Sequence, residues 1–270
     1  MIRLIALDVD GTLLTPDGQI TQATVDAIAQ ARAQGVKVVL ATGRSGQETS
    51  DFARRAGCNQ LAVSLSGALI VDTETGYHVR RWDMQHQSGR KALELCLNKD
   101  IQLMIFAGDQ IVLDHFSKQS QLKTFPFEVF HNTAVVVDDP LAYLEEQQLP
   151  LTKIHGDLNP EVYPLAEFDR LAGVEYTRSN DHDFELVPAG VNKGRALALL
   201  ALMYDLALED CAAVGDSDND LAMLRAVGYP VAMGNGAQSV KDVAKFVTAS
   251  NREEGVAKAI LHILEQNQEK

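Results

Sequence analysis

Short apolar runs alternate with helix-like periods in the first 72 residues of the chain. The expected elements, in order, are a strand at 2–7, a helix at 20–35, a strand at 36–44, a helix at 46–56 and two short strands within 61–72. The strands are almost continuously apolar, as expected for strands that are buried on both faces. Such strands alternating with helices are typical of a parallel sheet covered on both sides.

The middle of the chain has a different pattern. The segment IQLMIFAGDQIVLDH (101–115) contains two apolar stretches around a short turn, which is typical of a β-hairpin. The other expected elements are a helix at 86–98, a less regular stretch up to Pro150, a strand at 151–156, a helix at 159–171 and strands near 174–178 and 183–187. Paired strands with few helices indicate an antiparallel α+β unit.

The last third returns to the first pattern. Residues 211–224 predict a strand, a turn and a helix, PVAMGNG predicts a strand that runs into a glycine loop, and 253–266 predict a closing helix. We therefore expect an α/β fold in which residues 1–82 and 188–270 form a Rossmann-like parallel-sheet core. Residues 83–187 are then an inserted α+β domain.

Composition narrows the classes of partner. The 270 residues include 24 basic and 37 acidic side chains, a net charge of −13, which disfavours nucleic acid as a partner. The three cysteines show no CxxC spacing and an odd count gives no disulfide framework. The first strand begins almost at Met1, and no apolar run reaches the ~18 residues of a membrane span. We expect a cytoplasmic protein that binds no membrane.

Acidic side chains follow two of the predicted strands. Asp8 and Asp10 come directly after the first strand, and Asp216, Asp218 and Asp220 follow a strand in the last third. Because parallel strands end at one sheet edge, acids from both segments should converge there. Their repulsion on partial burial would cost on the order of 2–5 kcal/mol unless a positive group offsets it. An oxygen-rich site of this kind suits Mg²⁺.

Magnesium sites with few protein ligands commonly serve phosphate chemistry. An ionised aspartate such as Asp8 can attack phosphorus and form an aspartyl-phosphate. Asp10 is placed two residues away to protonate the leaving group and then to activate water. Lys193, at the start of a predicted helix, and Thr42, at another strand end, can hold the phosphate oxygens.

Simpler roles stay open for several of these residues. Thr42 could be the N-cap of the following helix, and Arg44 could be part of a structural salt bridge. Asp218 is expected at the surface or as a cap of the helix that begins near Asn219. The seven histidines show no metal-ligand spacing, and the GNG segment near the C-terminus lacks the full GxGxxG of a dinucleotide site.

Four motifs occur in the order found in the haloacid dehalogenase-like superfamily, which the chain resembles on these residues. They are Asp8-Val9-Asp10-Gly11-Thr12, Thr42-Gly43-Arg44, Lys193 and the segment GDSDND at 215–220. The segments GVNKGRALALL, VAMGNG and NREEGVAKAI further resemble the C-terminal half of the Cof-type phosphatases. That group carries a large cap between the second and third motifs, so the resemblance implies that residues 83–187 are a cap that sets substrate specificity.

The resemblance also implies catalytic and metal-binding roles. Asp8 would be the nucleophile and Asp10 the general acid and base. A magnesium ion would be held by the Asp8 carboxylate, the Asp10 backbone carbonyl and Asp216. Asp220 and Asn219 would hold these ligands in place without binding the metal ion directly.

Five positions are implied to bind phosphate or substrate. Thr42 and Lys193 would bind the phosphate group. Gly43 and Arg44 would shape the mouth of the site, and Asn235 of the GNG segment would also contact it.

The sequence therefore predicts a Mg²⁺-dependent phosphatase that hydrolyses small phosphorylated metabolites, sugar phosphates in particular. One alternative is a phosphosugar mutase, which would have to shield the aspartyl-phosphate from water. A signalling or binding module that carries a phosphorylated aspartate is another alternative, against which the second acidic cluster argues. Ser66 stands where relatives often have Asn, so a substrate contact by this residue is not implied. Neither a particular substrate nor an oligomeric state follows from the sequence.

Overall fold

The computed structural model describes residues 1–98, 101–124, 128–157, 167, 170–178 and 182–268. The chain divides into two compact units. The first unit comprises residues 1–80 and 192–270, and the second comprises residues 81–191. The expected boundaries, after residues 82 and 187, lie within a few residues of this division.

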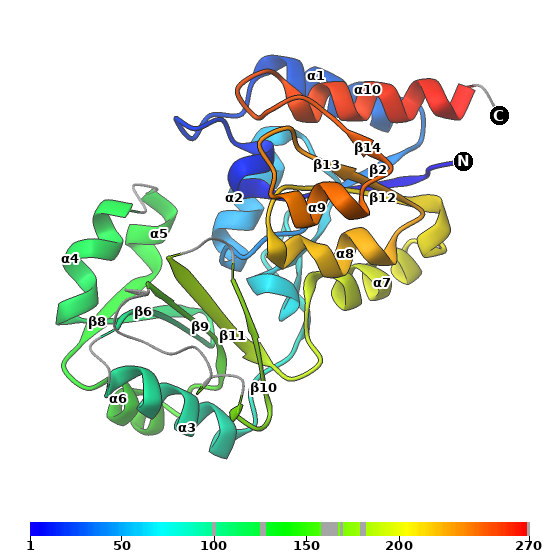
Figure 1. The fold of residues 1–270 in the computed structure, drawn as a ribbon. Helices are drawn as coiled ribbons and strands as arrows, with labels where there is room; N and C mark the ends of the chain where they lie inside the picture. Colours follow the sequence, from blue (N-terminus) through cyan, green and yellow to red (C-terminus); the bar gives the residue numbers. More distant parts are fainter. Residues whose placement is uncertain (99–100, 125–127, 158–166, 168–169, 179–181, 269–270) are drawn as a thin grey trace. The chain divides into compact units, whose positions relative to one another are not determined.

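The first unit is built around a parallel sheet of five strands in the order β14-β13-β12-β1-β2 (Figure 1). The strands are β1 (Leu4–Leu7), β2 (Lys37–Leu40), β12 (Cys211–Gly215), β13 (Tyr229–Ala232) and β14 (Phe246–Val247). The central strand β1 pairs in parallel with both β12 and β2, and all four of its residues are fully buried. The polar residues that follow β1, β12 and β2 therefore emerge from neighbouring positions of the sheet.

Helices cover both faces of this sheet, as Figure 1 shows, with α1 and α10 packed together on one side and α7 and α8 on the other. The helices are α1 (Gln22–Ala33), α2 (Gly46–Ala56), α7 (Lys193–Met203), α8 (Leu221–Ala226), α9 (Gln238–Val243) and α10 (Gly255–Gln268). A parallel bridge between Ala41 and Val63 leads from β2 to a small antiparallel sheet. That sheet consists of β3 (Leu61–Ser64), β4 (Leu69–Asp72) and β5 (His78–Arg81).

The second unit is an α+β domain with a six-stranded sheet in the order β10-β11-β9-β6-β7-β8. The strands are β6 (Gln102–Ala107), β7 (Gln110–Asp114), β8 (Ala134–Val137), β9 (Leu151–Asp157), β10 (Val174–Thr177) and β11 (Asp183–Pro188). All its pairs are antiparallel except β7 with β8. The helices are α3 (His86–Leu97), α4 (His115–Thr124), α5 (Glu128–Thr133) and α6 (Pro140–Glu146).

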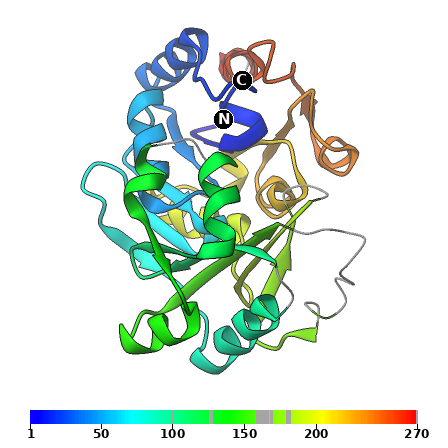
Figure 2. The same ribbon diagram turned by 90° about the vertical axis from the view of Figure 1, so that its left-hand side faces the viewer.

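One face of this second sheet packs on helices α3 and α6. Alternate residues of the central strands, such as Ile105, Ile154 and Phe184, are fully buried against Leu93 and Cys96 of α3. Figure 2 shows α3 and α6 side by side beneath the sheet, as in Figure 1. The period-2 pattern of the strands and the helical period of α3 thus bury one common core.

The predicted fold class is confirmed, with a parallel-sheet core and an α+β unit. The stretch before Pro150 was expected to be irregular, and this expectation is wrong, because it contains α4, α5, β8 and α6. Helix α6 does carry a start signal, since the side chain of Asp139 caps it and Pro140 occupies its first turn. Most of the helix expected at 159–171 lies outside the described residues.

Three further short elements, β5, α9 and β14, were not predicted from the sequence, and none exceeds six residues. The described helices include none with the length and apolar character needed to cross a membrane.

Candidate active site

Two aspartates meet at the carboxyl edge of the parallel sheet. Asp8 follows β1 and Asp216 follows β12, and the backbone N–H of Asp8 donates to the carbonyl of Val214 at 3.0 Å. Gly11, in the turn after Asp8, has a φ of +78°, and a Cβ there would lie 2.3 Å from Oδ2 of Asp216. A glycine at this position therefore lets the loop after β1 approach the second aspartate.

A buried lysine joins these acids from the opposite segment. Lys193 is the first residue of α7, and its side chain is 1% exposed. Its Nζ donates to Oδ1 of Asp8 at 2.7 Å, to Oδ1 of Asp220 at 2.7 Å and to Oδ1 of Asn219 at 3.3 Å. The three acceptors match the three N–H donors of an ammonium group, so Lys193 is held in one orientation.

Asp220 is engaged through both carboxylate oxygens. Oδ1 accepts from Lys193, and Oδ2 accepts from the backbone N–H groups of Asp216 and Ser217 at 2.9 and 3.2 Å. The residue is fully buried. Asp220 therefore shapes the loop that carries Asp216, and both of its oxygens already accept hydrogen bonds.

Burial and like charge raise the pKa of two carboxyl groups. The pKa of Asp8 lies well above its ordinary value because burial and the charge of Asp220 outweigh the lowering effect of Lys193. Burial and Asp220 raise the pKa of Asp216 to about 7, against the hydrogen bond from Thr12. Burial lowers the pKa of Lys193, but the contacts with Asp220 and Asp8 raise it overall. The carboxylates thus outnumber the one ammonium group, which favours binding of a divalent cation.

The residues present fit a magnesium ion. Asp8, Asp216 and Asp220 each offer a carboxylate oxygen within 4.8 Å of the others. Among the described residues, Oδ2 of Asp8 and Oδ2 of Asp216 accept no hydrogen bond, whereas Asp220 is fully engaged. Two carboxylates with unused oxygens match the preference of Mg²⁺ for few protein ligands and several waters.

Asp10 lies near these groups but makes a different contact. Its carboxylate pairs with Arg44 through two hydrogen bonds of 2.7 and 2.8 Å, and the side chain is 54% exposed. Arg44 also donates to Glu48 at 2.8 Å. The salt bridge considered for Arg44 is therefore present. Burial lowers the pKa of Arg44, but Asp10 and Glu48 raise it overall.

The alternative role of Thr42 as an N-cap is excluded, because Ser45 caps α2. Thr42 is fully buried, and its hydroxyl accepts from the backbone N–H of Arg44 at 3.2 Å. Gly43 lies between these two residues and is half-buried. Thr42 thus lies just after the end of β2, at the start of the loop that carries Arg44.

Asn235 connects two loops of the first unit. Its Nδ2 donates to the carbonyl of Gly11 at 2.8 Å, and its Oδ1 accepts from the N–H of Asn251 at 2.9 Å. Asp218 is exposed and accepts from Ser239, so it is a surface residue and not the cap, a position that Ser217 takes.

Ser66 is buried in a left-handed turn with a φ of +57°, and its N–H donates to the carbonyl of Thr42 at 3.0 Å. The next residue, Gly67, has a φ of +102°, and a Cβ there would lie 2.3 Å from the backbone of Asn192. This turn therefore packs directly against the residue that caps α7 and precedes Lys193.

Two residues of the site were missed as contributors. The hydroxyl of Thr12 donates to Oδ1 of Asp216 at 2.9 Å, and Glu48 anchors Arg44. In the sequence, Thr12 stood out only as the last residue of the first motif, and nothing indicated its contact with Asp216. Glu48 lies three residues after Ser45, which is the S-x-x-E spacing of a capping box, so the sequence did contain a signal for its position.

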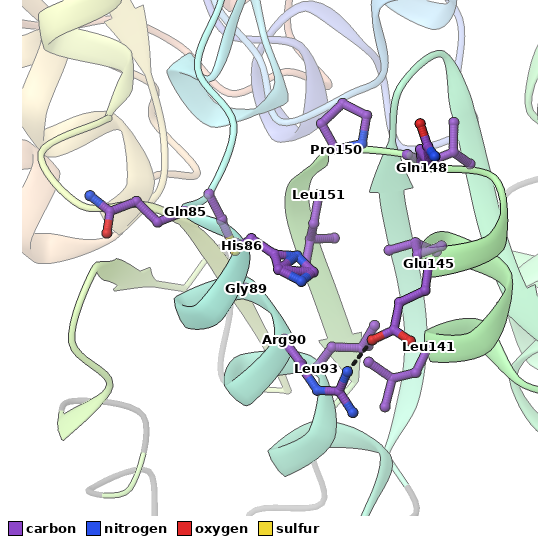
Figure 3. A pocket seen from close by; sticks show the side chains of 13 residues that line it. Gln85, His86, Gly89, Arg90, Leu93, Leu141, Glu145, Gln148, Pro150 and Leu151 are labelled. Atoms are coloured by element: carbon purple, nitrogen blue, oxygen red, sulfur yellow. Dashed lines mark hydrogen bonds and ion pairs between the residues drawn. The ribbon is translucent and has the colours of Figure 1, made fainter.

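The second unit contains a cavity of about 520 Å³ between α3, α6 and the start of β9 (Figure 3). Leucines such as Leu93 and Leu151 supply its apolar wall, and the ion pair of Arg90 with Glu145 joins the two helices beside it. Its lining includes none of the aspartates Asp8, Asp10, Asp216 and Asp220. The chemistry of the protein is therefore indicated by the acidic cluster of the first unit.

Comparison with known proteins covers nearly the whole chain. Residues 5–260 match the haloacid dehalogenase-like hydrolases. Phosphatase YwpJ of Bacillus subtilis is 28% identical over 97% of this chain and 100% of its own length. The 5-amino-6-(5-phospho-D-ribitylamino)uracil phosphatase YcsE of the same organism is 29% identical over 97% of this chain and 95% of its own. The solved structure of a haloacid dehalogenase-like hydrolase from B. subtilis, 27% identical, superimposes with a TM-score of 0.87 over 97% of this chain and 100% of that one.

Proposed function

The chain belongs to the haloacid dehalogenase-like hydrolase family and is a phosphatase, and from this premise we propose that it hydrolyses phosphate monoesters of small metabolites with the help of Mg²⁺. The observation that carries the proposal is the contact of Lys193 with Asp8, which lies beside Asp216 and Asp220. This arrangement offers an attacking carboxylate, a fixed positive charge and spare oxygens for a metal ion.

In the proposed reaction, a carboxylate oxygen of Asp8 attacks the phosphorus of the ester. The bond between phosphorus and the leaving oxygen breaks, and that oxygen takes a proton from the carboxyl group of Asp10. Water then attacks the aspartyl-phosphate and gives a proton to the carboxylate of Asp10. The bond between phosphorus and Asp8 breaks, which releases inorganic phosphate and restores both side chains.

The remaining residues orient these groups in the proposal. Lys193 holds Asp8 and places its positive charge beside the phosphate, Thr42 supplies a hydroxyl to the phosphate, and Asp220 with Asn219 keeps Lys193 in place. Gly43, Arg44 and Asn235 shape the entrance.

A bound Mg²⁺ would neutralise the charge that develops on the transferring oxygens. Asp8, Asp216 and the backbone carbonyl of Asp10 would hold it. The donor chemistry supports this assignment, since Mg²⁺ prefers carboxylate and carbonyl oxygens.

The substrate class is proposed to be sugar and polyol phosphates. The relative YcsE is named for a substrate with a phosphorylated ribityl chain, which is a polyol phosphate. Residues 81–191 form a separate compact unit, and we assign to it the role of a cap that selects the substrate. The three cysteines form no disulfide, which is consistent with the reducing cytoplasm that we propose as the location.

The test is release of inorganic phosphate from a panel of sugar and polyol phosphates, with added Mg²⁺ and with EDTA as the control. We expect turnover with Mg²⁺, loss of turnover with EDTA, and a fall of at least about a thousandfold in Asp8→Asn. The exposed Asp218 offers a matched control, since Asp218→Asn should keep wild-type turnover. Wild-type turnover in Asp8→Asn would contradict the mechanism, and absence of hydrolysis across the panel would contradict the substrate class.

A further inference from the structure

One guanidinium group connects Asp10 to the first turn of α2. Arg44 donates through Nε and Nη2 to the two carboxylate oxygens of Asp10 at 2.8 and 2.7 Å, and through Nη1 to Oε1 of Glu48 at 2.8 Å. The side chain of Arg44 is only 11% exposed. A single planar fork therefore holds two carboxylates, one on each side.

Glu48 is the most firmly fixed member of this chain of contacts. Its side chain is 3% exposed, and its Oε2 accepts from the hydroxyl of Ser45 at 2.8 Å and from the N–H of Ser45 at 3.2 Å. These bonds form the capping box of α2, in whose first turn a negative charge is also favoured by the helix dipole. A charge buried this deeply would be costly without the cation of Arg44 beside it.

Asp10 lies at the solvent-exposed end of this series of contacts. It lies in the turn after β1, beside Gly11 with its positive φ, and its side chain is 54% exposed. A proton carrier must be held within a fraction of an ångström of its working position. A bidentate pair with an arginine fixes both the place and the rotation of a carboxylate.

We propose that Glu48 is a positioning residue, which holds Arg44 and, through it, orients the carboxylate of Asp10 for proton transfer. The inference rests on the proposed function, because it names the support of the proton carrier and adds no new reaction. Ser45 and Glu48 then link the cap of α2 to the chemistry, and the segment from Arg44 to Glu48 acts as one unit.

The test uses Glu48→Gln, which keeps the size of the side chain and an acceptor for Ser45 but removes the charge that holds Arg44. The measurement is kcat/KM for p-nitrophenyl phosphate and phenyl phosphate, two esters of similar shape. Nitrophenolate leaves readily without a proton, whereas the more basic phenolate needs proton transfer. We expect kcat/KM for phenyl phosphate to fall about tenfold more than that for p-nitrophenyl phosphate.

The matched control is Thr21→Ala, which removes the side-chain cap of α1 and leaves Arg44, Ser45 and Glu48 unchanged. This variant should have a lower Tm and an unchanged ratio of the two kcat/KM values. Should Glu48→Gln fail to fold, Arg44→Lys applies the same test, because a lysine lacks the fork that serves both carboxylates. An equal loss for both esters, or no loss, overturns the proposal. Failure of the wild-type chain to release phosphate from these esters and from the sugar and polyol phosphates would instead overturn the proposed function.

Discussion

Lys193 is the residue on which the charge balance of the site depends. Its ammonium contacts Asp8 and Asp220 at 2.7 Å each, and all three groups are buried. Removal of one partner leaves buried charges uncompensated, which typically costs about 3–5 kcal/mol. The same substitution also removes the cation that holds Asp8, the proposed nucleophile.

We therefore expect Lys193→Met to lower the free energy of unfolding by about 3–5 kcal/mol at pH 8 and to abolish turnover. The loss of stability should be smaller at pH 5, where protonation of the carboxyl groups removes the uncompensated charge. Urea unfolding at both pH values measures this difference. Lys241→Met, on the surface helix α9, serves as a control, and an equal loss of stability at pH 5 and pH 8 would argue against the charge explanation.

Thr12 acts on Asp216 through a single hydrogen bond of 2.9 Å. This bond lowers the pKa of Asp216, so its removal in Thr12→Val should raise that pKa and weaken metal binding. We expect the Mg²⁺ concentration that gives half-maximal activity to rise about three- to tenfold at pH 7, which corresponds to about 1 kcal/mol for one hydrogen bond. The exposed Thr75 provides the control variant Thr75→Val, and an unchanged Mg²⁺ requirement in Thr12→Val would contradict the role of Thr12.

At the scale of elements, the turn between β3 and β4 sets the position of α7. Gly67 has a φ of +102°, and a Cβ there would lie 2.3 Å from the backbone carbonyl group of Asn192. Backbone atoms cannot move aside as a flexible side chain can. A substitution at this turn should therefore shift the start of α7, where Lys193 lies.

Gly67→Ala is expected to destabilise the protein by more than about 2 kcal/mol and to lower kcat at least about tenfold. Gly57→Ala is the matched control, because Gly57 also has a positive φ, of +73°, but no atom lies within 4 Å of its added Cβ. The control should cost only about 1 kcal/mol and keep kcat. Thermal unfolding and phosphate release measure both effects, and similar losses in the two variants would refute the link between this turn and Lys193.

The sequence predicted the long and strongly patterned elements well. The apolar strands β1, β2 and β12 and the helices α1, α2, α3 and α10 appear within a few residues of their expected positions, because burial on both faces or a helical period leaves a clear pattern. The stretch before Pro150 was missed. Its helices are 10 residues or shorter, and α4 has little contrast between its faces, so periodicity carries little signal there.

The site followed from sheet topology more than from local pattern. Asp8 and Asp216 are 208 positions apart, yet the parallel pairing of β1 with β12 brings them together. The buried strands predicted that both acids reach one sheet edge, but not which strands pair. The contacts of Arg44 with Asp10 and Glu48 were not predictable in the same way. They depend on the rotamer of the Arg44 side chain, which decides which nearby carboxylates it contacts. Packing around the first turn of α2 determines that rotamer.

For the whole molecule, the acidic cluster couples folding to protons and metal. The pKa of Asp216 rises from 3.8 to about 7 on folding, so the folded state binds more protons than the unfolded state between these values. Stability must therefore fall as pH rises through this range, by up to about 4 kcal/mol for this group, and the full loss is present above pH 7. A divalent cation that binds the ionised carboxylates opposes this loss, because it stabilises the folded state alone.

We accordingly expect 10 mM Mg²⁺ to raise the Tm by several degrees at pH 8 and by little at pH 5, where protons occupy the same oxygens. Differential scanning fluorimetry with and without EDTA measures the two shifts. Asp216→Asn should remove most of the Mg²⁺ effect at pH 8 and should raise the Tm of the metal-free protein there, since the amide carries no charge to bury. Equal shifts at both pH values would mean that Mg²⁺ binds elsewhere on this acidic chain, because only a site made of carboxylates with raised pKa values loses its metal to protons across this range.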